Sequence, residues 1–224
     1  MTPRNRVAFR GYNTAVVESR ESRGVGDALA VPITSFLTPS ELDSLGFANL
    51  GHDVCISRHA SIYNPERISL GSHVRLDDFA ILTTGTQGRI EIGSYVHVGA
   101  FCALYGRGDI TLEDYCTVSA RVSIFTTSDD YSGEHLTNPT IPADYTGVHV
   151  APVILRRHVL VGAHSVILPG VEIGRGSAVG ALSLVTESIE PWGVYAGVPV
   201  RRLKDRTQGL LELERRLQAD VGDQ

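Results

Sequence analysis

Residues 155–189 decide the fold, because they divide into units of six: LRRHVL (155–160), VGAHSV (161–166), ILPGVE (167–172), IGRGSA (173–178), VGALSL (179–184) and VTESI (185–189). The first position of every unit is aliphatic, and the fifth is small or β-branched. No helix has this period, since its apolar face recurs every 3.6 residues, and an ordinary strand alternates every two. A sustained sixfold repeat predicts a solenoid of short stacked strands, with three units per coil and the aliphatic side chains inside.

Glycine occupies the second position of three of these units, at Gly162, Gly174 and Gly180. Glycine adopts a positive φ at lower cost than any residue with a side chain. We therefore expect these glycines to form the tight corners of the solenoid.

The same register extends upstream, with coils that begin at Leu50, Ile68, Ile90, Ile110 and Val153, and a further coil from Ile173. The steps from Ile68 to Ile90 and on to Ile110 exceed three units of six, so one corner carries small loops. We predict an all-β protein, a parallel β-helix over residues 48–190. An N-terminal arm with a short helix (1–47) precedes it, and a closing segment with a C-terminal helix (191–224) follows it.

Two helices are expected outside the repeats. Thr38-Pro39-Ser40-Glu41 forms a capping-box pattern, which predicts a helix over residues 39–46 that covers the open end of the solenoid. Leu210, Leu213 and Leu217 keep helical spacing and predict a helix over 203–219. The lead-in 1–36 is irregular, with one strand expected near Thr14–Val17.

One long insertion, FTTSDDYSGEHLTNPTIPADYTGVHVAP (125–152), interrupts the repeats. A loop of this length inside a compact domain is typically functional. Its polar side chains suit recognition of a polar substrate, and Tyr131, His135 and Asn138 are the candidate substrate contacts. The simpler interpretation of His135, and of His149, is an ordinary polar loop residue.

Composition excludes several classes of protein. The 224 residues are 42% hydrophobic with a net charge of −5, which argues against a general nucleic-acid binder. No stretch of 18 apolar residues or signal-peptide pattern occurs, so we expect a cytoplasmic protein without a membrane span. Cys102 and Cys116 fall on the inward fifth position, and the three cysteines lack metal-ligand spacing, so we interpret them as reduced thiols in the core.

The repeats, the inserted loop and the closing segment GVYAGVPVRRLK (193–204) together resemble the hexapeptide-repeat acyltransferases. Within that family, HVGAFCALYG (97–106) and SDDYSGEHLTNP (128–139) are similar to the sugar acetyltransferases of surface-polysaccharide and nucleotide-sugar pathways. The resemblance implies a left-handed β-helix, acetyl-CoA as cosubstrate, no metal, and a homotrimer with its active site between adjacent subunits. The implied activity is acetyl transfer to a sugar hydroxyl or amine. The acceptor, and the choice between oxygen and nitrogen, stay open.

Acetyl transfer needs a base for the attacking group and donors for the developing oxyanion. Related enzymes place a histidine base in the loop, in a Thr-x-x-His-Pro-like segment, but residues 126–131 here read TTSDDY. Asp129 or Asp130 could replace it if burial raised its pKa, although paired aspartates also form loop caps. His97 is the best single candidate, because it precedes a first position and should point outward from the solenoid.

The resemblance also implies a coenzyme A site along the closing segment. Ala196, Gly197 and Pro199 are similar to the family's Gly-x-Pro-Ala closure, and small residues at two corners leave room for the pantetheine arm: Gly162, Ala163, Gly180 and Ala181. A basic cluster follows, from which Arg201, Lys204 and Arg206 are the candidate partners of the coenzyme phosphates. The alternative is a solvated start of the C-terminal helix.

Two other interpretations stay open. A γ-type carbonic anhydrase shares this fold and needs three histidine ligands around zinc, and the chain has eight histidines. A noncatalytic solenoid scaffold would bind no coenzyme A and would leave the long loop without a purpose. Outward Phe79 and Phe101 are apolar groups that a lone solenoid would expose, which is consistent with a trimer. The alternative is that they lie under the N-terminal arm.

Overall fold

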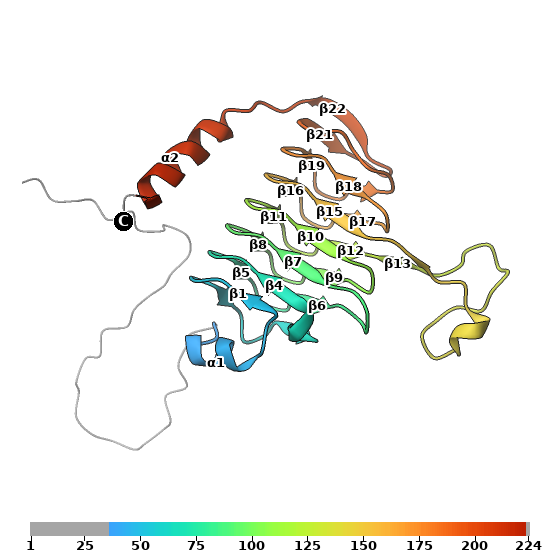
Figure 1. The fold of residues 1–224 in the computed structure, drawn as a ribbon. Coiled ribbons are helices and arrows are strands. Elements are labelled where there is room, and N and C mark those ends of the chain that lie inside the picture. The colour runs from blue at the N-terminus through green and yellow to red at the C-terminus, as the bar shows by residue number, and fades with distance from the viewer. Residues whose placement is uncertain (1–35, 223–224) are drawn as a thin grey trace, which may run out of the picture. The chain divides into compact units, whose positions relative to one another are not determined.

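The structure is a computed structural model and describes residues 36–222 (Figure 1). Three sheets run along the molecule, and each coil contributes one short strand to each sheet in turn; the strands pair parallel except for the last pair of the second sheet. These residues form a left-handed parallel β-helix, as expected. The segment 1–35, which includes the strand expected near Thr14–Val17, lies outside the described residues.

The strands are two to five residues long. Sheet 1 contains β1 (Asn49–Leu50), β4 (Ile68–Leu70), β7 (Ile90–Ile92), β10 (Ile110–Leu112), β15 (Val153–Leu155) and β18 (Glu172–Ile173). Sheet 2 contains β2 (Cys55–Ile56), β5 (Arg75–Leu76), β8 (His97–Val98), β11 (Thr117–Val118), β16 (Leu160–Val161), β19 (Ala178–Val179), β21 (Gly193–Ala196) and β22 (Arg201–Asp205). Sheet 3 contains β3 (Ser61–Tyr63), β6 (Ile81–Thr83), β9 (Ala103–Tyr105), β12 (Ser123–Phe125), β17 (Val166–Ile167) and β20 (Leu184–Val185).

The core follows the sixfold register. Ile68, Ile90 and Ile110 pair coil over coil and are fully buried, which confirms the predicted alignment. Cys102 and Cys116 are buried at the fifth position, as predicted. Burial raises the pKa of the Cys102 thiol to about 11 and that of Cys116 to about 12, so neither is an effective nucleophile at neutral pH.

The role predicted for the second-position glycines is wrong. Positive φ occurs instead at the fourth position, in residues with side chains such as Phe79 (61°) and Phe101 (59°). The second-position glycines allow close stacking of one coil on the next. A Cβ on Gly71 would lie 2.6 Å from the backbone carbon of Gly93, and a Cβ on Gly162 would lie 2.4 Å from the nitrogen of Ala181.

The N-terminal helix is confirmed as α1 (Pro39–Ser44), with the capping box of Thr38 and Glu41 present. Its Leu42 is buried in the core at the end of the solenoid. The C-terminal helix α2 spans Leu210–Gly222, so the predicted start at residue 203 is wrong. Residues 201–205 form β22, which pairs antiparallel with β21 and satisfies its backbone groups there.

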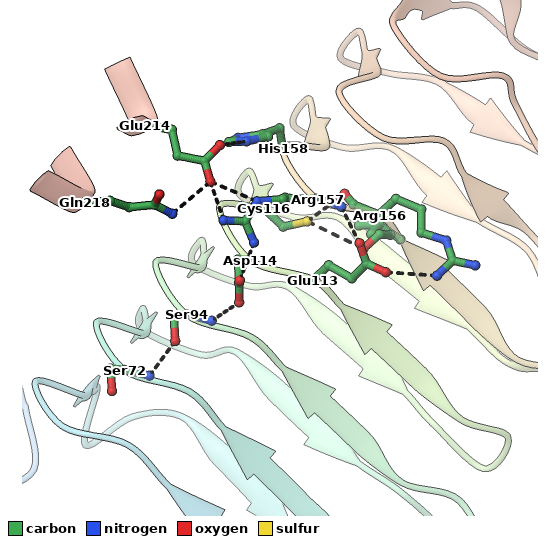
Figure 2. Close-up of polar contacts among 11 residues, drawn as sticks. Ser72, Ser94, Glu113, Asp114, Cys116, Arg156, Arg157, His158, Glu214 and Gln218 are labelled. Atoms are coloured by element: carbon green, nitrogen blue, oxygen red, sulfur yellow. Dashed lines mark hydrogen bonds and ion pairs between the residues drawn. The ribbon is translucent and has the colours of Figure 1, made fainter. Parts of the chain in front are cut away.

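Glu214 attaches α2 to the corner between sheets 1 and 2 (Figure 2). Its carboxylate accepts hydrogen bonds from Nε of Arg157 at 3.0 Å and from Nε2 of His158 at 2.6 Å. Arg157 also donates to Asp114, and Asp114 accepts from the Ser94 amide at 2.7 Å. His158 stacks on Tyr115 and is only 7% exposed, because α2 covers it.

Candidate active site

His97 lies on β8 and points outward from sheet 2, in the column that contains Arg75, Thr117 and Leu160 in other coils. This confirms the predicted orientation. Its side chain is 43% exposed, and its Nε2 lies 2.8 Å from Oδ2 of Asp77 in the preceding coil. Arg75 donates from Nε to the other oxygen of Asp77 at 2.6 Å.

Asp77 is charged at neutral pH. Burial raises the pKa of its carboxyl, but the hydrogen bonds from His97 and Arg75 outweigh burial, so the pKa lies below its usual range. A carboxylate accepts the proton on Nε2 of His97, which leaves Nδ1 as the acceptor nitrogen. This arrangement, an imidazole oriented by a carboxylate, is that of a general base.

Asp77 was not predicted from the sequence. The sequence does contain a signal for it, namely its position in the six-residue unit. Asp77 occupies the second position of its unit, where later coils place the small residues Gly99 and Ser119. A carboxylate in a column of small residues, one coil before an outward histidine, indicates a partner for that histidine.

The inserted loop begins after β12 with β13 (Thr127–Ser128) and returns through β14 (His149–Val150), which pair antiparallel. The 3₁₀ helix η2 (Ala143–Tyr145) lies between them. Figure 1 shows the loop leaving the solenoid beside β12 and extending away from β8. The loop candidates and His97 are therefore not brought together within one protomer.

Asp130 holds the loop in shape. Its carboxylate accepts the Ser132 amide at 2.8 Å and the His135 amide at 2.9 Å. These hydrogen bonds, those of Ser132 foremost, lower the pKa of Asp130 well below its usual range. The raised pKa that a carboxylate base needs is therefore not found at Asp130, and its geometry is that of a loop cap. Asp129 is exposed beside it.

The three candidate substrate contacts differ in their surroundings. Tyr131 is 92% exposed at the end of the loop. Asn138 accepts the Thr140 amide at 2.9 Å, and His135 Nδ1 lies 3.1 Å from Oδ2 of Asp130. Tyr131 is therefore free to meet a ligand, whereas His135 and Asn138 maintain the loop.

The small residues expected to accommodate the pantetheine arm form one continuous strip at the corner between sheets 2 and 3. The Gly162 amide donates to Val179 at 2.7 Å, and the Gly180 amide donates to Tyr195 at the same distance. A Cβ on Gly180 would lie 3.0 Å from Cβ of Ala196. The structure thus stacks the three predicted pairs in successive coils: Gly162 and Ala163, Gly180 and Ala181, Ala196 and Gly197.

The predicted basic residues have different environments. Arg201 and Pro199 line a cleft of about 430 Å³ at the end of the solenoid. Lys204 is exposed on β22. Arg206 donates from Nη1 to the carbonyls of His158 and Gly176, at 3.0 and 2.9 Å. These contacts make Arg206 a structural residue, which differs from the expected phosphate contact.

Comparison with known proteins shows that the chain is similar to sugar acyltransferases. The chain is 39% identical over 180 residues to the dTDP-4-amino-4,6-dideoxy-D-glucose acyltransferase of Escherichia coli, covering 80% of this chain and 93% of the relative. The N-acyltransferase AntD from Bacillus cereus, crystallised with dTDP and 3-hydroxybutyryl-CoA, matches with 46% identity and a TM-score of 0.81 over 85% of this chain and all of that one. The putative lipopolysaccharide O-acetyl transferase WbbJ of E. coli is 29% identical, covering 66% of this chain and 74% of the relative.

No protein-family model matches the chain. The relatives named above are acyltransferases, which favours the transferase over the scaffold and the carbonic anhydrase interpretations. Among residues 36–222, no helix is long and apolar enough to cross a membrane.

Proposed function

The chain belongs to the hexapeptide-repeat sugar acyltransferases, and from this premise we propose that it acylates the amino group of a dTDP-linked 4-amino-4,6-dideoxy sugar. The enzyme is an acyl-CoA-dependent sugar acyltransferase. The observation that carries the proposal is the 39% identity over nearly the full length of a relative named for this acceptor. A variant of AntD, 46% identical to this chain, was crystallised with dTDP-4-amino-4,6-dideoxyglucose and coenzyme A.

The site offers what amide formation needs. The neutral amine attacks the thioester carbonyl, the carbon–sulfur bond breaks, and the coenzyme leaves as its thiol. His97 accepts at Nδ1 the proton that the amine loses and passes it to the departing thiolate, while Asp77 holds the ring through Nε2. The coenzyme arm lies along the strip of small residues at Gly162, Gly180 and Gly197, and Arg201 meets its phosphates.

The active site in this proposal is completed by a second protomer of a homotrimer. His97 and the loop are separated within one chain, because the loop extends away from β8. A neighbouring protomer's loop, with Asp129 and Tyr131, would close the site over His97. Unpaired cysteines, Cys55, Cys102 and Cys116, support the proposed location in the cytoplasm.

The test of the acceptor uses two sugars that differ at one group. Purified enzyme is given acetyl-CoA or 3-hydroxybutyryl-CoA with either dTDP-4-amino-4,6-dideoxyglucose or dTDP-glucose, which has hydroxyls only. Thiol release and the product mass are followed. We expect amide product from the amino sugar alone. Transfer to dTDP-glucose with none to the amino sugar would overturn the proposal.

The shared site is tested by complementation. His97→Ala and Asp129→Ala chains, each of which we expect to lose most of its activity alone, are denatured together and refolded as mixed trimers. If the site lies between protomers, mixed trimers regain part of the activity, since some interfaces combine an intact His97 with an intact loop. Activity that stays absent in mixtures of confirmed trimers would contradict it.

A further inference from the structure

The corner between sheets 1 and 2 carries a cluster that the acyl-transfer site does not use. Its fourth positions hold side chains at positive φ, and from His73 onward these stack coil over coil: Asp53, His73, Tyr95, Tyr115 and His158. The upper part of this column lies under α2 at His158. In the first two coils, this corner instead holds two histidines and a carboxylate. His52 is the neighbour of Asp53 in the chain, and His73 lies in the next coil.

The three ligand atoms of this cluster converge. Oδ2 of Asp53 lies 2.9 Å from Nδ1 of His52 and 3.6 Å from Nδ1 of His73. All three atoms lie within 4.8 Å of one another. The two imidazole rings meet edge to face, with their centroids 4.9 Å apart, so both nitrogens can face one point beside the carboxylate.

The solenoid fixes the cluster in place. The ring of His73 stacks on Tyr95 at 4.5 Å, and the amide of His73 donates to the carbonyl of His52 at 2.9 Å. The amide of His52 donates to Oγ of Ser72 at 3.2 Å. A ligand set on such a backbone loses little conformational freedom when an ion binds.

Hydrogen bonding alone accounts for only part of this arrangement. The 2.9 Å contact is a hydrogen bond, but the 3.6 Å separation is too long for one. An exposed ion pair adds little stability, so the pairing gives no reason for a second histidine to face the same oxygen. Two imidazole nitrogens and a carboxylate oxygen form a ligand set typical of divalent transition metals.

We propose that His52, Asp53 and His73 bind one divalent transition-metal ion, of which zinc is the representative, with water in the remaining positions. The ion joins the turn after β1 to the turn after β4 and so connects the first two coils at the N-terminal end of the solenoid. The site is separate from His97, and its role is to stabilise these coils rather than to take part in acyl transfer.

The test measures metal binding directly. Untagged full-length protein is freed of metal with a chelator and titrated with zinc in a calorimeter, and with cobalt(II) by absorption. Residues 1–35 and 223–224 contain no histidine or cysteine, so they add no competing ligands of those types. We expect one ion per chain and a rise in melting temperature when zinc is added.

Matched variants locate the ion. His52→Gln, Asp53→Asn and His73→Gln should each weaken binding by at least about tenfold, the loss typical of disturbing a metal's supporting shell. His59→Gln, at an exposed histidine outside the cluster, and Cys55→Ser, at the nearby exposed thiol, should leave affinity unchanged. Absence of a stoichiometric ion in the wild type, or full affinity in His73→Gln, would overturn the proposal. Neither result would bear on acyl transfer, which is assayed separately.

Discussion

Nε2 of His97 and Oδ2 of Asp77 lie 2.8 Å apart across two adjacent coils. The contact depends on the register of the solenoid, which stacks β8 on β5 so that His97 pairs with Arg75. The outward imidazole then reaches the corner that follows β5, where Asp77 lies. A histidine and a carboxylate twenty residues apart in sequence thus form one hydrogen-bonded pair.

Replacing either member of this pair should slow the chemical step. We expect His97→Gln to reduce kcat by about 10² or more, since general-base catalysis typically contributes that much. Asp77→Asn should reduce kcat less, with KM little changed, because it removes only the orientation and charge behind the imidazole. Steady-state kinetics separate the two constants. Asp78→Asn is the control, since Asp78 contacts Ser57 instead. Undiminished kcat in His97→Gln would assign the base to Asp129 or another group.

Glu214 should account for most of the attachment of α2. Glu214→Gln removes the charge that Arg157 and His158 share, and hydrogen bonds to charged groups contribute roughly 1.5–3 kcal/mol. We expect a loss of that order in the free energy of unfolding, and earlier proteolysis within α2. Glu212→Gln, at a half-exposed residue of the same helix that pairs only with exposed arginines of that helix, should change stability by less than about 0.5 kcal/mol. Equal effects of the two variants would contradict this role.

Acid should weaken the contact of Glu214 with Arg157 and His158. Burial lowers the pKa of His158 below its ordinary 6.5 more than Glu214 raises it, and the hydrogen bonds from Arg157 and His158 hold the pKa of Glu214 below its ordinary 4.5 despite burial. Groups with lowered pKa values in the folded state bind protons more readily when unfolded. Their contribution to stability is therefore complete above pH 6.5 and is lost progressively below it. Urea denaturation from pH 8 to pH 4 should show this loss in the wild type and a smaller one in His158→Gln.

The repeat was readable from sequence because it is local: first-position residues such as Ile90 and Ile110 repeat a pattern that burial requires in every coil. The start of α2 could not be predicted in this way, because the spacing of leucines does not show that residues 201–205 pair with β21 as a strand. Asp77 was missed for a related reason. Its role depends on a contact with the next coil. Only an alignment of the coils shows that Asp77 is a carboxylate at a position where later coils have small residues.

The second-position glycines should be intolerant of any side chain, because each lies against the backbone of the next coil. Gly71→Ala places a Cβ 2.6 Å from the backbone of Gly93, which cannot move without shifting a whole coil. We expect it to destabilise the protein by about 1–3 kcal/mol, as overpacked sites do. Gly209→Ala, where nothing lies within 4 Å of the added Cβ, should be neutral or slightly stabilising. Thermal melts compare the pair. A neutral Gly71→Ala would show that the coils are more loosely stacked than the structure indicates.

The basic residues of the closing segment should separate into two classes. Arg201 lines the cleft at the end of the solenoid and is exposed, so Arg201→Gln should raise KM for acyl-CoA, by about tenfold if a contact of about 1.4 kcal/mol is lost, and leave the melting temperature unchanged. Arg206 donates to the carbonyls of His158 and Gly176, so Arg206→Gln should lower the melting temperature and leave KM for acyl-CoA near its wild-type value. Kinetics run well below both melting temperatures keep the two effects apart. A raised KM in Arg206→Gln, with KM unchanged in Arg201→Gln, would assign the phosphate contact to Arg206 and contradict the role of Arg201.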